Sequence, residues 1–210
     1  MTNLGRRQFF QSAIIGAATF AAPGFASGII FRSGTGNLQG DGPSPHLLAR
    51  AKSALEAHRS RIRVTDRLAI ADFSKPSREP RFYIVDLKNG TATSFLVAHG
   101  KGSDPSHSGW VQSFSNTHGS EATSAGAYMV GDTYFGQYGE SRRLLGLEPQ
   151  NDQAEARAIV IHPAWYVNKS LIQEQGKIGR SQGCFAFAQD DIGQILHQVA
   201  PGTLLFADKA

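Results

Sequence analysis

Cys184 is the only cysteine in the 210-residue chain, and this single thiol limits how the fold can be held together. A lone cysteine cannot close an intramolecular disulfide, and one sulfur cannot build a thiolate metal site. The fold must therefore rest on a hydrophobic core, for which a domain of this size has enough residues. The thiol itself can be a small buried side chain, one end of an intermolecular bridge, or a nucleophile.

The amino-terminal residues are arranged like an export signal. Arg6 and Arg7 precede a short apolar stretch over 13–22, which is about half of the roughly 20 residues that a membrane-spanning helix needs. Adjacent arginines are typical of twin-arginine signals, which serve proteins exported already folded. A cytosolic protein with an amphipathic start is the alternative, but no acidic residue precedes Asp41.

We therefore expect three regions along the chain. Residues 1–26 form the export signal, 27–45 a flexible leader rich in Gly, Ser and Pro, and 46–210 one folded domain. We expect the mature protein in the periplasm, with no membrane span left after the signal is removed. A single unpaired cysteine is unusual in an oxidising compartment, which favours a thiol kept for its reactivity.

Charge and composition argue against a nucleic-acid-binding protein. The formal net charge is +4, and part of it comes from the two arginines of the expected signal. No basic stripe with interleaved aromatic residues occurs. His99, His107 and His118 lie in a region rich in Gly and Ser without a His-x-x-x-His pair, so we expect no metal site and no cofactor.

Short apolar or alternating runs dominate the expected domain. We expect strands over 67–73, 81–87, 91–99, 127–134, 157–162 and 203–207. Lys88-Asn89-Gly90 between two of these runs predicts a hairpin. Helical spacing occurs over 45–62, 169–175 and 189–199. Many short strands with few helices favour a mainly β (α+β) fold.

A histidine upstream of the cysteine suggests a pair for nucleophilic catalysis. His162 ends an apolar run, where a strand would present it as a general base. A thiol reacts as its thiolate, and an imidazole can take the thiol proton and later return it to a departing amine. On spacing alone, an inert core cysteine is the commoner case.

The residues before Cys184 suit the same chemistry. Gly183 would allow a tight turn and close approach of a substrate, and the backbone amides of Gly183 and Cys184 could form an oxyanion hole. Ser181 could hydrogen-bond the His162 ring or the backbone of the turn, and a backbone carbonyl is another possible partner for the ring.

The stretch from Ile159-Val160-Ile161-His162 to Arg180-Ser181-Gln182-Gly183-Cys184 resembles the active-site signature of the L,D-transpeptidase (YkuD-like) catalytic domains. In that family a histidine on a strand is followed by a Ser/Thr-x-Gly-Cys turn. Further segments are similar to the murein L,D-transpeptidase branch, namely 99–103, 114–116, 131–136 and 144–149, so that the resemblance covers about 65–207. It implies a β-sandwich or barrel with a few peripheral helices, and an enzyme whose cysteine attacks a peptide stem of peptidoglycan.

Three positions depart from the family pattern. Gln182 stands where histidine is commoner, Pro163 stands where glycine often follows the catalytic histidine, and Ala186 stands where arginine is common. Without that arginine the carboxylate of the substrate must be bound elsewhere, and Arg180 and Arg142 are the candidates.

Some aromatic and histidine side chains are further candidates for substrate binding. His99 and Tyr134 lie in family-like segments and are expected to line the cleft, although packing is an equal interpretation for Tyr134. Trp110 and Trp165 could stack on sugars, but packing is the preferred interpretation.

The resulting hypothesis is a peptidoglycan L,D-transpeptidase that forms an acyl-enzyme on Cys184 from a tetrapeptide stem and transfers it to an amine. An L,D-carboxypeptidase or endopeptidase, with water as the acceptor, is the nearest alternative. A non-catalytic module that binds the cell wall is the alternative from another class.

Overall fold

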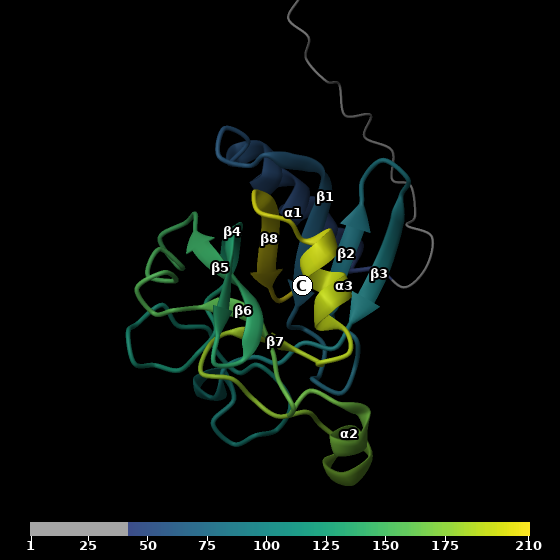
Figure 1. Cartoon of the computed structure of the whole chain (residues 1–210), viewed down its shortest axis with the longest axis vertical. Helices are drawn as coiled ribbons and strands as arrows, with labels where there is room; N and C mark the ends of the chain where they lie inside the picture. Colours follow the sequence, from purple (N-terminus) through teal and green to yellow (C-terminus); the bar gives the residue numbers. More distant parts are fainter. Residues whose placement is uncertain (1–41) are drawn as a thin grey trace, which may run out of the picture. The chain divides into compact units, whose positions relative to one another are not determined.

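A single sheet of eight strands dominates residues 42–210, the part of the chain that the computed structural model describes (Figure 1). The strand order is β3-β2-β1-β8-β4-β5-β6-β7. In chain order the elements are α1 (Pro45–Ala57), β1 (Val64–Asp72), β2 (Phe82–Asp86), β3 (Thr91–Phe95), the 3-10 helix η1 (Lys101–Ser103), β4 (Gly126–Gly136), β5 (Gly139–Gly146), β6 (Val160–Pro163), α2 (Lys169–Gln175), β7 (Phe185–Phe187), α3 (Ile192–Gln198) and β8 (Thr203–Asp208). The expected mainly β fold is confirmed. The expected export signal and most of the expected leader lie outside the described residues.

The sheet curls until its two edges approach each other. β2 and β7 are far apart in the strand order, and in a flat sheet about 29 Å would separate them. The rings of Phe82 on β2 and Phe187 on β7 nevertheless have centroids 4.7 Å apart. Beyond β3, the amide of Ala98 donates to the carbonyl of Ala186 on β7 at 2.9 Å. The inner face of the sheet is therefore enclosed almost as in a barrel.

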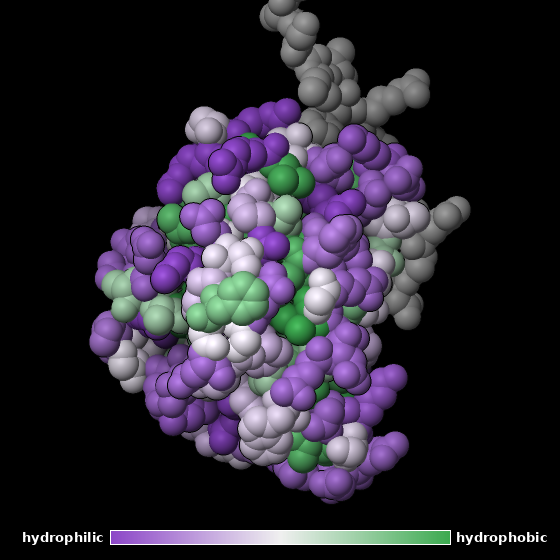
Figure 2. Space-filling view, in the orientation of Figure 1, coloured by the Kyte–Doolittle hydropathy of each residue, from purple (hydrophilic) through white to green (hydrophobic). Residues whose placement is uncertain are grey.

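The main hydrophobic core lies inside this curl. Fully buried side chains from both halves of the sheet meet there, and Phe185 packs edge-on against Tyr128 with centroids 5.6 Å apart. Ile195 and Leu196 of α3 cover the same core. The face drawn in Figure 2 is mostly hydrophilic, with hydrophobic residues in small patches. Because Phe185 is anchored in the core, the residue before it, Cys184, has a well-defined position.

α1 covers the outer face of β1, β2 and β8. Ser44 caps its start by accepting a hydrogen bond from the amide of Leu47 at 3.2 Å. The helix was expected over 45–62 but ends at Ala57. The chain then turns, and Ile62 packs in the same apolar cluster as the buried side of α1. After Ala57 the amides of Arg61 and Ile62 both donate to the carbonyl of His58, in a turn that follows the end of the helix.

Two hairpins shape the sheet, and one of them was predicted. The hairpin at Lys88-Asn89-Gly90 is confirmed, because β2 and β3 pair antiparallel and Gly90 has φ +65°. The side chain of Asp86 accepts hydrogen bonds from two amides of this turn, both at 2.9 Å. The second hairpin joins β4 and β5. β5 was not predicted, because its sequence mixes charged and apolar residues.

β6 and β7 run parallel at one edge of the sheet and position the candidate site. Parallel strands need a crossover connection, and this one contains α2, which occupies the expected residues 169–175. Asn168 caps its start, and Gly176 ends it with φ +71°. β7 has only three residues and was not predicted. No helix within 42–210 is long and apolar enough to cross a membrane.

Candidate active site

Cys184 stands directly before β7 and lines a cleft of about 510 Å³. Segments from β6, from the turn before β7 and from the tip of the β4–β5 hairpin form its walls. Both residues predicted to be catalytic, Cys184 and His162, line this cleft, together with Arg157, Arg180, Tyr134 and Tyr138.

The pairing of β6 with β7 explains why Cys184 and His162 share one cavity. In this parallel pair Ile161 lies opposite Phe185, and His162 lies opposite Ala186. Side chains two residues apart on a strand point to the same face. Cys184, two residues before Ala186, is therefore on the same side of the strands as His162, although a long crossover separates the two in sequence.

Ser181 holds the turn that carries the cysteine. Its hydroxyl accepts a hydrogen bond from the amide of Gly183 at 3.1 Å and donates one to the carbonyl of Cys184 at 2.7 Å. Of the two partners proposed for Ser181 from the sequence, the structure shows the backbone of the turn. The amide of Gly183 is therefore already engaged, and the structure does not support its expected use as an oxyanion donor.

Both the backbone conformation at position 183 and the lack of room for a side chain require glycine there. Its φ is +115°, a conformation that residues with a Cβ rarely adopt. A Cβ on Gly183 would lie 2.8 Å from the carbonyl oxygen of Ala122 and 2.8 Å from Cδ1 of Ile159. The turn is thus packed tightly against the loop before β4 and against the residue before β6.

The imidazole of His162 is buried and held in one tautomer. Its Nδ1 lies 2.9 Å from the carbonyl oxygen of Pro163, which can only accept, so Nδ1 carries the proton and Nε2 is the basic nitrogen. The ring of Tyr138 stacks on the imidazole with centroids 4.5 Å apart. Burial lowers the pKa of His162 below its ordinary value. The ring is therefore neutral near pH 7, as a general base must be.

The environment of Cys184 favours the protonated thiol in the resting state. Burial raises the pKa of Cys184, while a backbone hydrogen bond with Val160 and the charge of Arg157 act in the opposite direction. Sγ lies 3.5 Å from the carbonyl oxygen of Ala158, within reach of a weak hydrogen bond. Ala158 itself has φ +54°, an uncommon conformation for a residue other than glycine. A thiol in these surroundings needs a base to become a nucleophile.

Arg157 is a site residue that the sequence analysis did not single out. It lines the cleft, and its Nη2 would lie 3.3 Å from a Cβ on Gly183. Its guanidinium donates four hydrogen bonds to the loop before β4, at Ser115, Ser120, Ala122 and Ser124. Arg157 thus fastens this loop against the cysteine turn and brings a positive charge to Cys184. The only signal in the sequence was a basic residue at the start of the apolar run before His162.

The two arginines predicted to bind a carboxylate lie in different places. Arg180 lines the cleft, while its Nη1 donates to the backbone carbonyls of Asp104 and Pro105. Arg142 does not line the cleft. It is buried, and its Nη2 donates to the carbonyl of Leu196 at the end of α3 at 2.9 Å. The expectation that Arg142 binds substrate is therefore replaced by a structural role.

His99 is fully buried and does not line the cleft, contrary to expectation. Its Nδ1 accepts a hydrogen bond from Nη2 of Arg81 at 2.7 Å, and its Nε2 lies 3.4 Å from Oδ2 of Asp104. Burial, together with the charge of Arg81, lowers the pKa of His99 to about 3. The backbone carbonyl of His99 accepts a hydrogen bond from the amide of Ser181 at 2.9 Å. His99 therefore supports the cysteine turn from behind.

Tyrosine side chains form much of the cleft wall. Tyr134 lines the cleft as expected, and the guanidinium of Arg143 lies over its ring, 4.9 Å from the centroid. Tyr138 comes from the tip of the same hairpin, and Tyr166 comes from the segment after β6. Burial raises the pKa of Tyr166 above its ordinary value, so its hydroxyl stays protonated.

Two of the positions that depart from the family pattern have clear places in the structure. Ala186 is fully buried in an apolar cluster with Ala98 and Ile178 and does not line the cleft. Pro163 supplies the carbonyl that orients the ring of His162.

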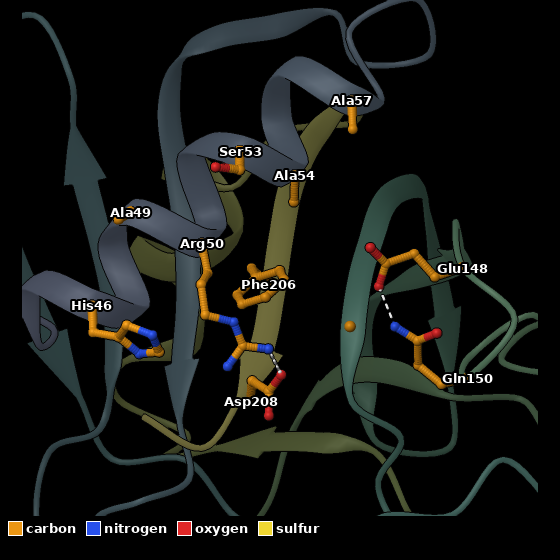
Figure 3. Close-up of a pocket in the computed structure, with 11 residues that line it drawn as sticks. His46, Ala49, Arg50, Ser53, Ala54, Ala57, Glu148, Gln150, Phe206 and Asp208 are labelled. Carbon is orange, nitrogen blue, oxygen red and sulfur yellow. Dashed lines mark hydrogen bonds and ion pairs between the residues drawn. The ribbon is translucent and has the colours of Figure 1, made fainter. Parts of the chain in front are cut away.

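A second groove, of about 450 Å³, lies between α1, β8 and the start of β4, and it contains none of the predicted site residues (Figure 3). Arg50 on α1 forms an ion pair with Asp208 at the end of β8. Across the groove, Glu148 accepts a hydrogen bond from the side chain of Gln150 at 2.6 Å. These polar groups satisfy one another and join α1 to the sheet. Within 42–210, no cluster of three or more His, Cys, Asp or Glu is arranged to hold a metal ion.

Comparison with solved structures finds several L,D-transpeptidases. One from Mycobacterium smegmatis is 13% identical, with 68% of this chain and 58% of that chain covered and a TM-score of 0.42. L,D-transpeptidase 3 from Mycobacterium tuberculosis, in complex with a faropenem-derived adduct, is 11% identical, with 69% and 60% covered and a TM-score of 0.44. This chain spans about three fifths of the length of each of these two. A search of curated protein sequences finds no match.

A family model gives the clearest relationship. The model of the L,D-transpeptidase catalytic domain matches residues 41–207, which include the whole sheet apart from the last residue of β8 and every residue of the cleft. The chain therefore belongs to the L,D-transpeptidase catalytic domain family.

Proposed function

We propose that this protein is a cysteine L,D-transpeptidase acting on peptidoglycan in the periplasm. The observation that carries the proposal is the presence of Cys184 and a neutral, tautomer-fixed His162 in the walls of one cleft. The substrate is a tetrapeptide stem, and the scissile bond joins its third residue to the terminal D-amino acid.

In the first half-reaction the thiol becomes a nucleophile. Nε2 of His162 takes the proton of Cys184, and Sγ attacks the carbonyl carbon of the scissile bond. The tetrahedral intermediate collapses to a thioester, the C–N bond breaks, and His162 returns the proton to the departing amine of the D-amino acid. In the second half-reaction an acceptor amine attacks the carbonyl carbon of the thioester and gives its proton to His162. The new C–N bond forms, the C–S bond breaks, and His162 returns the proton to the thiolate of Cys184.

The surroundings of Cys184 suggest how charge is stabilised during the reaction. Because the amide of Gly183 is engaged by Ser181, the amide of Cys184 is the better candidate oxyanion donor. In this proposal Arg157, whose charge lowers the pKa of Cys184, stabilises the thiolate, and Arg180, which lines the cleft, binds a carboxylate of the stem. Together these groups take over the contribution of the arginine that Ala186 replaces.

The proposal is tested by mass spectrometry of the intact protein after incubation with a tetrapeptide muropeptide or a carbapenem. We expect a covalent adduct on Cys184 that is absent in Cys184→Ala and at least 100-fold slower to form in His162→Ala. His118→Ala is the matched control, because His118 is an exposed loop histidine outside the cleft, and it should react at the wild-type rate.

The same incubation separates the alternatives. Cross-linked dimers in the products support transpeptidation, whereas tripeptides without dimers indicate an L,D-carboxypeptidase. Absence of an adduct on the wild-type protein, under conditions where stem peptides bind, would refute the enzyme and favour a wall-binding module.

We further propose export by the twin-arginine route, on the basis of Arg6 and Arg7. Replacing both arginines with lysine should retain the protein in the cytoplasm, as measured by cell fractionation. Normal periplasmic levels of the double variant would instead indicate the general secretory route.

A further inference from the structure

A third cavity, of about 440 Å³, lies at the carboxyl ends of β6 and β7. Its floor is apolar and includes Leu96, Ala164 and Val167, which belong to a small buried cluster. One wall is the side chain of Trp165, which is 72% exposed. The indole does pack at its edge against Tyr166, as preferred from the sequence, but most of its surface stays exposed and lines the cavity.

Hydrogen bonds fix the backbone before and after Trp165. The side-chain amide of Asn168 donates to the carbonyl of Trp165 at 2.6 Å, while its oxygen caps the start of α2. The amide of Ala164 donates to Phe187 on β7 at 2.7 Å, and the amide of Gly179 donates to Tyr166 at 2.8 Å. The indole is thus mounted on a fixed segment, so that binding to it would require little ordering of the backbone.

The lining of the cavity also includes Gln189, Asp190 and Asp191, in the segment that leads from β7 into α3. Within 42–210, the side chains of these three residues make no hydrogen bond or ion pair with another residue of the chain. Carboxylates accept hydrogen bonds and the amide both donates and accepts. With only Lys169 as a positive charge in its lining, the cavity disfavours an anionic ligand.

An exposed aromatic ring and free carboxylate and amide groups in the lining of one cavity match the chemistry of a sugar. The C–H groups of a pyranose ring form a weakly positive apolar face, which complements the negative face of an indole. The hydroxyl groups at the edge of the same ring need hydrogen-bond acceptors, and an acetamido group can pair with an amide. Apolar cavities with a few convergent polar groups are typical of small-molecule sites.

The cavity adjoins the candidate active site. Tyr166 lines the Cys184 cleft, and the next residue toward the amino terminus, Trp165, lines this third cavity, with the two rings packed edge-on at 5.8 Å. The two cavities therefore have walls formed by two residues that are adjacent in the chain and packed against each other.

We propose that this cavity is a saccharide subsite that binds a neutral N-acetylated sugar of the glycan strand to which the stem peptide is attached. The inference rests on the proposed function for its choice of sugar. Trp165 supplies the stacking surface, and Gln189, Asp190 and Asp191 receive the polar groups of the ring. The subsite would favour stems that are still attached to glycan over free peptides.

The first test measures sugar binding without any peptide chemistry. In the full-length chain with Trp110→Phe and Cys184→Ala, Trp165 is the only tryptophan and no acylation can occur. Titration with the β-1,4-linked tetramer of N-acetylglucosamine should change the tryptophan emission saturably. Asp190→Asn should weaken this binding about two- to tenfold. Asp132→Asn, at an exposed residue outside the cavity, should leave it unchanged.

The second test uses turnover of two substrates that share the same stem. Trp165→Ala should raise the KM for a disaccharide-tetrapeptide about two- to tenfold, with kcat unchanged and with no effect on the free tetrapeptide. Trp165→Phe should recover part of the loss, and circular dichroism checks that both variants fold.

Three outcomes would overturn the subsite: no saturable change on sugar titration, an equal effect of Trp165→Ala on both substrates, or displacement of the sugar by a simple amine such as lysine methyl ester. The sugar titration does not depend on the reactivity of Cys184. Failure of the adduct experiment would therefore refute the proposed function without deciding whether the sugar binds.

Discussion

Replacing Gly183 with alanine tests directly how the turn before Cys184 is built. A Cβ at this position would meet a backbone oxygen and the side chain of Ile159, both at 2.8 Å, in a residue with φ +115°. The backbone conformation costs a residue with a Cβ about 1–3 kcal/mol, and overpacking costs about another 1–3 kcal/mol. We expect Gly183→Ala to lower the free energy of unfolding by about 2–6 kcal/mol. Because the strained turn would displace the thiol, we expect acylation of Cys184 to slow by about 100-fold.

Two other glycines separate the contributions to this effect. Gly176 has φ +71° but open space around its Cα, so Gly176→Ala should cost only about 1 kcal/mol for the backbone. Gly193 lies in α3 with ordinary φ and nothing nearby, so Gly193→Ala should stabilise the protein by about 0.5–1 kcal/mol. Both control variants should be acylated at the wild-type rate.

The free energy of unfolding is measured by urea denaturation followed by circular dichroism, and acylation by a time course of adduct mass. Acylation is compared in buffer without urea, after circular dichroism has checked that all four proteins are folded there. The reasoning fails if Gly183→Ala is no less stable than Gly176→Ala, or if its Cys184 reacts at the wild-type rate.

Three further predictions concern charge and pH. Arg157→Met should move the pH profile of iodoacetamide alkylation of Cys184 to higher pH, because the positive charge that lowers the pKa of the thiol is lost. Arg157→Lys keeps the charge and should shift the profile less. Equal shifts in the two variants would mean that charge is not the cause. Tyr138→Ala should expose His162 to water and raise the pKa of the imidazole toward its ordinary value. The fall of the acylation rate at acid pH should then begin at a higher pH. If the pH dependence does not change, stacking by Tyr138 is not what buries the ring. The pKa of His99 falls from 6.5 to about 3 on folding, so the stability that its neutral form contributes is complete above pH 6.5 and is lost as the pH falls toward 3. In urea denaturation between pH 7 and 4, His99→Gln should therefore lose less stability on acidification than the wild type, although it starts from a lower value.

Local sequence signals predicted those elements whose causes are local. The Asn89-Gly90 turn follows from the conformational freedom of its glycine, and α2 follows from an Asn cap and a terminal Gly around a short run of helix-forming residues. Two strands had no such signal. β5 carries charged side chains on its exposed positions, and β7 is too short for an alternating pattern. Both exist because neighbouring strands provide hydrogen-bond partners for their backbones.

The order of side chains around the cleft depended on strand pairing and loop packing. His99 and Arg142 were expected in the cleft, but one is enclosed by Arg81 and Asp104 and the other reaches the end of α3. Arg157 was overlooked because its role arises from contacts with a loop more than thirty residues earlier in the chain. The spacing of Arg142 and Arg157 along the sequence does not indicate which of the two brings its charge close to the thiol of Cys184.

The sequence by itself determined the chemistry that is available: one thiol without a partner, a histidine at the end of an apolar run, and a Ser-x-Gly-Cys turn that resembles one family. These are properties of residue type and short-range order. Only the tertiary structure decided how they are used, because the parallel pairing of β6 and β7 brings Cys184 and His162 into one cleft, and Arg157 and Tyr138 reach that cleft from other parts of the chain. The single cysteine limits the proposed reaction to thiol chemistry, and the curled sheet surrounds that cysteine with a histidine, a positive charge and an enclosed cleft.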